Sequence, residues 1–587
     1  MVRTIYSRSD LFRIRHYFVY LLSAVLIGCS TTVAQTAEPR DTLHTNFRLG
    51  VVIVVDQMRP DYLTRFADLY TGGLARLTKT GILFTNAYHA HAATETAVGH
   101  TAISTGRFPG HNGIVGNDFF DRENNRTLYA CEDSTAKILG NSLASGRSPR
   151  LLQVDAIGDW LRGEYASAKV YSVALKDRAA ILLGGIKPDG AFWYDRTSGN
   201  FETSTYYMQR YPAWVDTFNT RHAVDSFFTV GWHKLFPDSF YTRSHADSFP
   251  GEGNGKNIVF PHSFDTTSGH PNARYYDAVY GTPFGDQLAL SFARAMVANT
   301  EMGKDSIPDL LLISCSSADA IGHAFGPNSQ EIEDYYLRLD KCLDTLFTFL
   351  DSAVGHAYYT VTLSSDHGVL PLPEDLVAAG IPARRLSVDT VVAAIKAAGA
   401  TFQTANGLSE NPIAECEDNV LLNYTSSRMK GMSDATLQNM VAAALRKIPF
   451  IADAYSRDEL QSGTAAGRPY ADLYINTFNP LHGPDIFLRF PEYTLVTSSP
   501  YGTSHGTPYS YDTDVPIVFE VPSKAPAVVQ DRVKTVDIAP TLAILLGVMP
   551  PDGIDGTPLT PVVGQISIEK KKPAQPRPTH SPKKSRK

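Results

Sequence analysis

Six acidic and histidine side chains of this chain could together bind divalent metal ions: Asp56, Asp319, His323, Asp366, His367 and His505. Carboxylate and imidazole groups form a ligand set that Zn²⁺ accepts without any thiolate. Asp319 and His323 are four residues apart, so one helical turn would bring both side chains to the same ion. Any one of these residues alone usually has a structural role, such as capping a helix. Their joint occurrence predicts a metal site.

Thr96 is the candidate nucleophile beside those ligands. It lies in the sequence Thr-Glu-Thr-Ala-Val-Gly-His at 94–100, ahead of a helix-compatible run that ends at Gly106. The ordinary interpretation is a threonine that caps a helix N-terminus. Next to a zinc ion, however, its hydroxyl would ionise at modest pH, and the free helix amides would favour an incoming phosphate. Thr96 is therefore predicted to attack a phosphoryl group.

Apolar runs precede the three aspartates and predict the strands that position them. Leu49–Val55 ends at Asp56, and residues 310–314 and 359–363 lead to Asp319 and Asp366. Such runs are typical of strands buried on both faces of a parallel sheet. Between two of them, apolar residues recur at helical spacing over 330–351. The alternation predicts an α/β fold with a doubly wound, mostly parallel central sheet and helices on both faces, whose ligands bind beyond the carboxyl ends of the strands.

The length of 587 residues predicts one large catalytic domain, from about 45 to 565, that carries insertions. The first insertion, at about 190–283, contains a predicted hairpin at 192–207 and then irregular sequence rich in His, Phe and Tyr. The second, at about 370–500, has helical patterns of its own at 387–398 and 434–447. Both insertions are expected to cap the active-site face.

Residues 1–35 are predicted to be a signal peptide, because four arginines precede a short apolar run at 18–28. That run is too short to span a bilayer, which takes roughly 20 apolar residues. Leu-Ile-Gly-Cys at 26–29 is similar to a bacterial lipobox, which would leave Cys29 lipidated; the alternative is a cysteine within a discarded signal. We expect a periplasmic or cell-envelope protein whose membrane contact is at most this lipid anchor. Residues 566–587, rich in Lys, Arg and Pro, predict a disordered basic tail.

The composition is that of an ordinary soluble enzyme, with 43% hydrophobic and 19% charged residues. A net charge of -7 argues against a nucleic-acid-binding surface. Beyond the signal, the remaining cysteines are Cys131, Cys315, Cys342 and Cys416, and none forms a CxxC pair. Disulfides after export are allowed by this count, and the sequence assigns no pairing.

The order and spacing of the motifs resemble those of the type I phosphodiesterase/nucleotide pyrophosphatase group of the alkaline phosphatase superfamily. The residues that carry the resemblance are the strand ending in Asp56 and the motifs at 96–100, 319–323, 365–368 and 504–506. The segment Asp-Ile-Ala-Pro-Thr at 537–541, with the Leu-rich stretch after it, is also similar to the superfamily's C-terminal part. The resemblance spans about 49–559 and implies an alkaline phosphatase-like fold that hydrolyses phosphate esters.

The resemblance also implies which residues would hold two zinc ions. Asp319, His323 and His505 would hold one ion. Asp56, Asp366 and His367 would hold the other, together with the oxygen of Thr96. Thr96 would then form a phosphothreonine intermediate that water hydrolyses.

Lys176 and Arg178, in Leu-Lys-Asp-Arg-Ala at 175–179, resemble a pair found in the group's bacterial phosphate-irrepressible alkaline phosphatases and generally missing from its diesterases. Asn117 matches an asparagine that donates to a phosphoryl oxygen. A monoester dianion exposes three charged oxygens, which a guanidinium and an ammonium can neutralise. The alternative for an isolated Lys-Asp-Arg is a solvated pair bridging Asp177. The resemblance thus implies an alkaline phosphatase that acts on small-molecule phosphate monoesters.

Three alternatives accompany that expectation. The nearest is a phosphodiesterase or nucleotide pyrophosphatase with the same two-zinc site, in which Lys176 and Arg178 play a minor part. A sulfatase is disfavoured, because the nucleophile position lacks the Cys-x-Pro-x-Arg or Ser-x-Pro-x-Arg pattern. The third is a cell-envelope binding protein that kept the fold and lost catalysis, against which the complete ligand set argues.

Overall fold

The central sheet is organised around β1 (Leu49–Val55), all seven residues of which are buried. Val51, Ile53 and Val55 pack into one hydrophobic core, whereas Val52 and Val54 pack into another on the opposite face. Successive side chains of a strand point to opposite faces, so a strand covered on both sides must be apolar throughout. The strand pairs in parallel with β8 (Asp309–Cys315) and β9 (Tyr359–Ser364). The three apolar runs thus form neighbouring parallel strands, as predicted.

The computed structural model describes residues 43, 45–141, 144–417 and 419–564. The predicted signal peptide with Cys29 and the predicted tail at 566–587 lie outside the described residues. Within the described part of the chain, no helix is long and apolar enough to span a bilayer. Cys131, Cys315, Cys342 and Cys416 are all free thiols.

The main sheet has nine strands in the order β17 (Ala527–Lys534), β2 (Ile82–Tyr88), β16 (Ile517–Glu520), β9, β1, β8, β5 (Val170–Ala174), β6 (Gly190–Tyr194) and β7 (Phe201–Glu202). Its centre, from β9 to β6, is parallel. Only β16 and β7 run antiparallel to their neighbours. The predicted mostly parallel sheet is confirmed.

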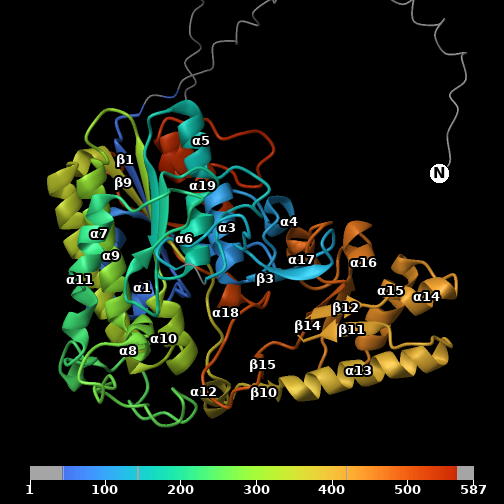
Figure 1. Cartoon of the computed structure of the whole chain (residues 1–587). Coiled ribbons are helices and arrows are strands. Elements are labelled where there is room, and N and C mark those ends of the chain that lie inside the picture. Colours follow the sequence, from blue (N-terminus) through green and yellow to red (C-terminus); the bar gives the residue numbers. More distant parts are fainter. Residues whose placement is uncertain (1–42, 44, 142–143, 418, 565–587) are drawn as a thin grey trace, which may run out of the picture. The chain divides into compact units, whose positions relative to one another are not determined.

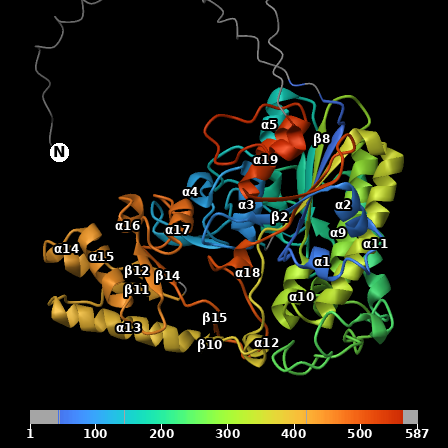
Figure 2. The same cartoon turned by 180° about the vertical axis from the view of Figure 1, so that it is seen from behind.

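Helices cover both faces of this sheet (Figures 1 and 2). One face packs against α2 (Gly73–Thr80), α9 (Pro283–Thr300) and α11 (Gln330–Ala353). The other packs against α5 (Ile157–Glu164) and α19 (Ile538–Leu545). The helix predicted at 330–351 is α11. The fold is therefore the doubly wound α/β arrangement expected from the alternation of strands and helices.

Shorter elements connect these layers and lie near the strand ends: α1 (Tyr62–Arg65), α3 (Thr96–Thr105), α4 (Pro109–Asn112), β3 (Asp118–Asp121), β4 (Arg126–Tyr129), α6 (Asp177–Gly184), α10 (Ser317–Phe325), η3 (His356–Tyr358), α18 (Ser510–Thr513), η4 (Thr535–Asp537) and α20 (Thr560–Val563). α3 and α6 pack against each other beside the sheet. Both begin close to the carboxyl ends of the central strands.

The segment predicted as a first insertion extends the sheet before it becomes irregular. Its hairpin consists of β6 and β7, which continue the main sheet beyond β5. It then forms α7 (Ala213–Thr220), η1 (Ala223–Phe227), η2 (Asp238–Phe240) and α8 (Ala273–Tyr280). Trp232 and Tyr275 of this segment are buried in the core that also contains α11. The segment therefore contributes to the body of the domain.

The second insertion forms a separate small layer, which we call the cap (residues 384–497; orange in Figure 1). Its sheet has the order β11 (Ile413–Cys416), β12 (Asn419–Leu422), β14 (Ile486–Arg489) and β13 (Asp453–Ser456). α13 (Val388–Ala405) and α15 (Asp434–Leu445) pack on that sheet through a hydrophobic core of the cap's own. The cap also contains α14 (Thr425–Met429), α16 (Arg457–Gln461) and α17 (Ala471–Thr477).

The cap is attached to the main domain on several sides, one of them the packing of α17 against α4. A parallel two-stranded ribbon, β10 (Arg384–Ser387) with β15 (Thr494–Thr497), joins it at its base, next to α12 (Pro373–Ala378). On the other side it meets the β3–β4 hairpin, where Arg122 forms a 2.8 Å ion pair with Asp485 and its amide donates to the Leu481 carbonyl. The cap is thereby held next to the hairpin that follows Asn117.

Candidate active site

Four neighbouring parallel strands, in the order β9, β1, β8 and β5, deliver the candidate residues to one edge of the sheet. Asp366 follows β9, Asp56 follows β1, Asp319 lies on α10 just after β8, and Lys176 follows β5. Thr96 is the first residue of α3, and His505 lies in the loop before α18. The structure brings these distant residues together, as their positions at strand ends predict.

Asp319, His323 and His505 form one group whose ligand atoms all lie within 4.8 Å of one another. Nε2 of His323 is 3.1 Å from Oδ1 of Asp319, and Nε2 of His505 is 3.5 Å from the same oxygen. The other ring nitrogen of each histidine contacts a backbone carbonyl, of Thr503 and Thr94 respectively. Those contacts orient both rings, so that Nε2 faces the carboxylate.

Asp56, Asp319 and His367 form a second group of the same compactness. Nε2 of His367 lies 3.4 Å from Oδ1 of Asp56 and 3.5 Å from Oδ2 of Asp366. The resemblance assigned Asp366 rather than Asp319 to this group. In the structure Asp319 stands between the two groups and belongs to both, while Asp366 borders the second.

Three buried polar atoms at this place have no hydrogen-bond partner among the described residues: Oδ1 of Asp56, Oδ2 of Asp366 and Nε2 of His367. Burying an unsatisfied carboxylate is costly, so such atoms normally bind a cation. Burial and the nearby carboxylate of Asp366 raise the pKa of Asp56 well above its usual range. These side chains therefore fit divalent metal ions in donor type, charge and position.

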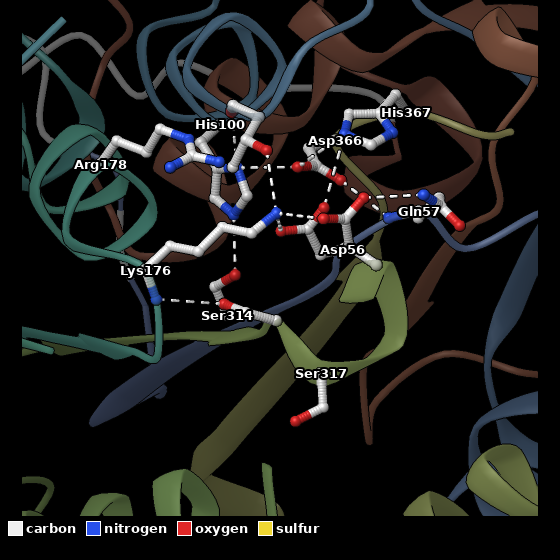
Figure 3. Close-up of polar contacts among 12 residues, drawn as sticks. Asp56, Gln57, His100, Lys176, Arg178, Ser314, Ser317, Asp366 and His367 are labelled. Atoms are coloured by element: carbon white, nitrogen blue, oxygen red, sulfur yellow. Dashed lines mark hydrogen bonds and ion pairs between the residues drawn. The ribbon is translucent and has the colours of Figure 1, made fainter. Parts of the chain in front are cut away.

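Lys176 is the only lysine or arginine that contacts these carboxylates in the described part of the chain. Its ammonium lies 2.6 Å from Oδ2 of Asp56, 2.7 Å from Oδ2 of Asp319 and 3.1 Å from the hydroxyl of Thr96. Figure 3 shows its side chain reaching toward Asp56. Burial would lower the pKa of Lys176, but the two carboxylates outweigh it and raise that pKa. One ammonium leaves most of the carboxylate charge uncompensated.

The structure also tests two simpler interpretations: that Thr96 only caps a helix, and that Lys176 and Arg178 only form a solvated pair around Asp177. Glu95, not Thr96, is the residue before the first turn of α3. Asp177 accepts hydrogen bonds from Tyr129 at 2.5 Å and from Arg147 at 2.6 Å, so its carboxylate does not bridge its two sequence neighbours. Thr96 and Lys176 therefore face the site rather than serving as a cap and a surface ion pair.

Arg178 and Asn117 lie on the other side of Thr96 and line a cleft that contains it. Nε of Arg178 is buried without a hydrogen-bond partner. Oδ1 of Asn117 accepts a 2.9 Å hydrogen bond from the amide of Ala97, which leaves its N–H donors free. Both side chains thus offer unused donors next to the Thr96 hydroxyl.

Gln57 and His100 support the site and were missed by sequence reasoning. Gln57 has a positive φ of 66°, and it donates to Asp319 Oδ1 at 2.7 Å and to Asp366 Oδ1 at 3.1 Å. His100 Nδ1 contacts the Thr96 carbonyl at 2.8 Å and lies 3.2 Å from Asp366 Oδ2, and Figure 3 shows its ring next to Asp366 and Ser314. The positive φ of Gln57 is a strained backbone conformation, and such conformations are concentrated at functional sites. No local sequence pattern marks Gln57 as a site residue. His100 belongs to the motif at 96–100, but its position there does not predict which groups it contacts.

Gly99 permits the close approach on which this arrangement depends. A Cβ atom at this position would lie 2.0 Å from the backbone carbonyl oxygen of Asp366, which is an impossible contact. Only glycine therefore lets α3 lie against the loop after β9. The glycine in the motif at 96–100 is explained by packing between the helix of Thr96 and the chain that carries Asp366.

Asp286 is a further positioning residue that the sequence did not reveal. From α9, its carboxylate accepts the amides of Ser316 and Ser317 at 2.8 and 2.9 Å and the hydroxyl of Tyr335 at 2.7 Å. It thereby caps α10, the helix of Asp319 and His323.

Asp286→Ala is expected to lower the free energy of unfolding by about 2–4 kcal/mol, because it leaves buried donors unsatisfied. Urea denaturation followed by circular dichroism measures the change. Asp344→Ala, an exposed aspartate on α11, is the matched control and should change stability by less than about 0.5 kcal/mol. Equal stabilities of the two variants would show that Asp286 does not hold α10.

The family model of type I phosphodiesterase/nucleotide pyrophosphatase matches residues 50–403 of this chain. The chain belongs to this family. The matched segment contains all the candidate ligands except His505. Alkaline phosphatase PafA of Elizabethkingia meningoseptica is 35% identical over 535 residues, covering 88% of this chain and 95% of the relative. Alkaline phosphatase PhoV of Synechococcus elongatus is 33% identical over 560 residues, covering 92% and 98%.

Solved structures agree with this membership. The crystal structure of wild-type alkaline phosphatase PafA matches with a TM-score of 0.80 and 34% identity, covering 88% of this chain and 99% of that one. A PafA variant with a threonine, an asparagine, a lysine and an arginine substituted matches with a TM-score of 0.81. The alkaline phosphatase-like fold predicted from the motifs is confirmed, and this phosphodiesterase-family chain is a metal-binding hydrolase.

Proposed function

We propose that this protein is an exported zinc-dependent alkaline phosphatase that hydrolyses small-molecule phosphate monoesters. The observation that carries the proposal is the placement of Lys176 and Arg178 at the start of α6, beside Thr96 and the carboxylates. A phosphate monoester is a dianion, and these two cations add positive charge where its non-bridging oxygens would lie. The alkaline phosphatases among the relatives support the same activity.

Two zinc ions are the proposed cofactors. Asp319, His323 and His505 would hold one ion, and Asp56, Asp366 and His367, together with the oxygen of Thr96, would hold the other. When bound, the ions supply positive charge that favours the ionised threonine hydroxyl and a departing oxygen anion. The compact group of Asp319, His323 and His505 supports the first assignment. The closeness of His367 to Asp56 and Asp366, and the unsatisfied Oδ1 of Asp56, support the second. The shared position of Asp319 supports a close pair of ions rather than distant ones.

Thr96 is the proposed nucleophile. Its oxygen attacks phosphorus in line with the leaving group, the bond from phosphorus to the ester oxygen breaks, and phosphothreonine forms. Lys176, whose ammonium is 3.1 Å from the hydroxyl, stabilises negative charge on that oxygen. The free donors of Asn117 and Arg178 bind the non-bridging oxygens and orient the phosphoryl group for attack. Water then hydrolyses the intermediate and releases phosphate.

The remaining parts of the proposal concern the ends of the chain and its domains. Residues 1–35 would direct export to the periplasm or cell envelope, with Cys29 as a possible site of lipid attachment. Residues 45–565 would form the catalytic domain with the two insertions, and 566–587 a basic tail. The arginine-led apolar run and the lipobox pattern support export.

The purified protein is expected to hydrolyse 4-nitrophenyl phosphate with a kcat/KM about 10²-fold above that for bis(4-nitrophenyl) phosphate, because a diester cannot use both cations fully. A zinc chelator should abolish the hydrolysis of both substrates, and added Zn²⁺ should restore it. Steady-state kinetics on the two esters, with metal content by mass spectrometry, measures this. A preference for the diester would favour the phosphodiesterase alternative. No turnover with near-zero zinc after metal-replete purification would favour the non-catalytic binding protein.

A further inference from the structure

The cleft that contains the candidate active site continues from Thr96 to the cap. Its volume is about 770 Å³. Thr96, Asn117 and Arg178 line it together with residues of β14 and of the chain after β14, among them Phe487 and Arg489. Ligand pockets typically enclose about 300–1,000 Å³, so the cleft has room for a sizeable leaving group next to the phosphoryl group.

The alternation of β14 explains why a charged side chain lines this cleft. Ile486 and Leu488 point into the hydrophobic core of the cap. Phe487 and Arg489 therefore lie on the opposite face of the strand, where Phe487 packs with Tyr474. The face of the cap sheet that looks away from the cap's own core thus presents one aromatic ring and one guanidinium to the cleft.

The guanidinium of Arg489 is anchored but not neutralised. Nη1 donates to the hydroxyl of Tyr509 at 3.1 Å, and the hydroxyl of Tyr509 donates in turn to the Phe490 carbonyl. The carbon of the guanidinium lies 5.2 Å from the ring centre of Tyr470. Nε is buried without a hydrogen-bond partner. These contacts hold the guanidinium in place and leave donors free for an additional group.

No carboxylate forms an ion pair with Arg489 in the part of the chain that the structure describes. Its cross-strand neighbour Asp453 is the nearest candidate by register, but that carboxylate pairs with Arg446 and Arg468. Glu415 and Glu417 also line the cleft, and both are exposed to solvent without contacting Arg489. A half-buried cation without an internal partner is costly, and a bound anion would offset that cost.

We propose that the cleft is a leaving-group subsite, in which Arg489 binds a second anionic group carried by the leaving group of a phosphate monoester. The inference rests on the proposed function, since it assigns the far end of the same substrate. Arg178 and Lys176 hold the phosphoryl end, and the cap holds the other. A guanidinium binds a carboxylate or a phosphate through two parallel hydrogen bonds. The substrate class is therefore phosphate monoesters of hydroxy acids and bisphosphates.

The test compares two aryl esters of the same size, 4-carboxyphenyl phosphate and its neutral isostere 4-carbamoylphenyl phosphate. We expect the parent enzyme to prefer the carboxylate by about tenfold or more in kcat/KM, mainly through a lower KM. In Arg489→Met, which keeps the apolar stem, the preference should fall to about one. Arg428→Met replaces an exposed cap arginine that pairs with Asp434, and this control should keep the parent's preference. Because the readout is a ratio, partial unfolding of a variant cancels.

A second set of three substrates distinguishes the two anions. The monophosphate and the bisphosphate of propane-1,3-diol are compared with the phosphate ester of 3-hydroxypropanoate, so that neutral, phosphate and carboxylate ends are tested on similar chains. Preference for either anionic end that disappears in Arg489→Met supports the subsite and identifies the anion. If that variant does not fold, Tyr509→Phe, which releases Nη1, should lower the preference instead.

Two outcomes overturn the inference. The first is a parent enzyme that hydrolyses the neutral and anionic esters equally well. The second is a preference that Arg489→Met leaves unchanged, or an equal loss of that variant on all substrates, which would show a structural role. Failure of the parent to hydrolyse any monoester contradicts the proposed function itself, and is thereby distinguished from failure of the subsite.

Discussion

Replacing Thr96 with alanine is expected to lower kcat for phosphate monoesters by at least about 10⁴-fold, because it removes the group that attacks phosphorus. Thr96 is 1% exposed, and among the described residues its hydroxyl hydrogen-bonds only to the ammonium of Lys176, so the change should leave the fold intact. Steady-state kinetics on 4-nitrophenyl phosphate measures the loss. Acid quenching with ³²P-labelled substrate should trap phosphothreonine in the parent enzyme and none in the variant.

Thr96→Ser is the matched control, since serine keeps a hydroxyl at the same place at the start of α3. It should retain a large part of the parent's turnover and become labelled on serine. If Thr96→Ala hydrolysed monoesters within tenfold of the parent, or if label appeared on another residue, Thr96 would not be the nucleophile. Zinc content should be nearly the same in all three proteins, because the carboxylates and histidines that form both groups are unchanged.

The sequence predicted the centre of the fold because its signals there are local. An unbroken apolar run such as Leu49–Val55 is stable only when both faces of the strand are covered, and β1 is covered on both. Parallel strands place their carboxyl ends at one edge, which is why Asp56, Asp319 and Asp366 could be expected to meet. The helical spacing of α11 was visible for the same local reason.

The remaining features depend on tertiary packing and leave no local pattern. Gln57 contacts Asp319 and Asp366 only because of a turn with positive φ after β1. The strands of the cap sheet are four residues each, too short for a clear alternation. β16 enters the middle of the sheet antiparallel to both neighbours, from a position late in the chain. Arg489 gains its role solely from the face of β14 on which it falls.

Arg178→Ala is expected to lower kcat/KM for a phosphate monoester by about 10²–10³-fold and that for a diester by less than about tenfold. A guanidinium that binds two charged oxygens contributes two charge-assisted hydrogen bonds, and an esterified oxygen cannot accept them as well. Arg178 lines the cleft, and among the described residues no group accepts a hydrogen bond from its Nε. Kinetics on 4-nitrophenyl phosphate and bis(4-nitrophenyl) phosphate measures both losses.

Arg178 tests the preference for monoesters more cleanly than Lys176 does. The ammonium of Lys176 also contacts Asp56 and Asp319, so its removal would alter two proposed metal ligands and lower hydrolysis of both substrate classes. Arg196→Ala is the matched control, because that exposed arginine in the turn between β6 and β7 pairs with Asp277, does not line the cleft and should change neither rate. If Arg178→Ala lowered kcat/KM equally for the monoester and the diester, the guanidinium would order the start of α6 without distinguishing the charge of the phosphoryl group. A loss confined to the monoester requires direct contact with an oxygen that only the monoester leaves charged, which is the distinction between a phosphomonoesterase and the diesterases of its family.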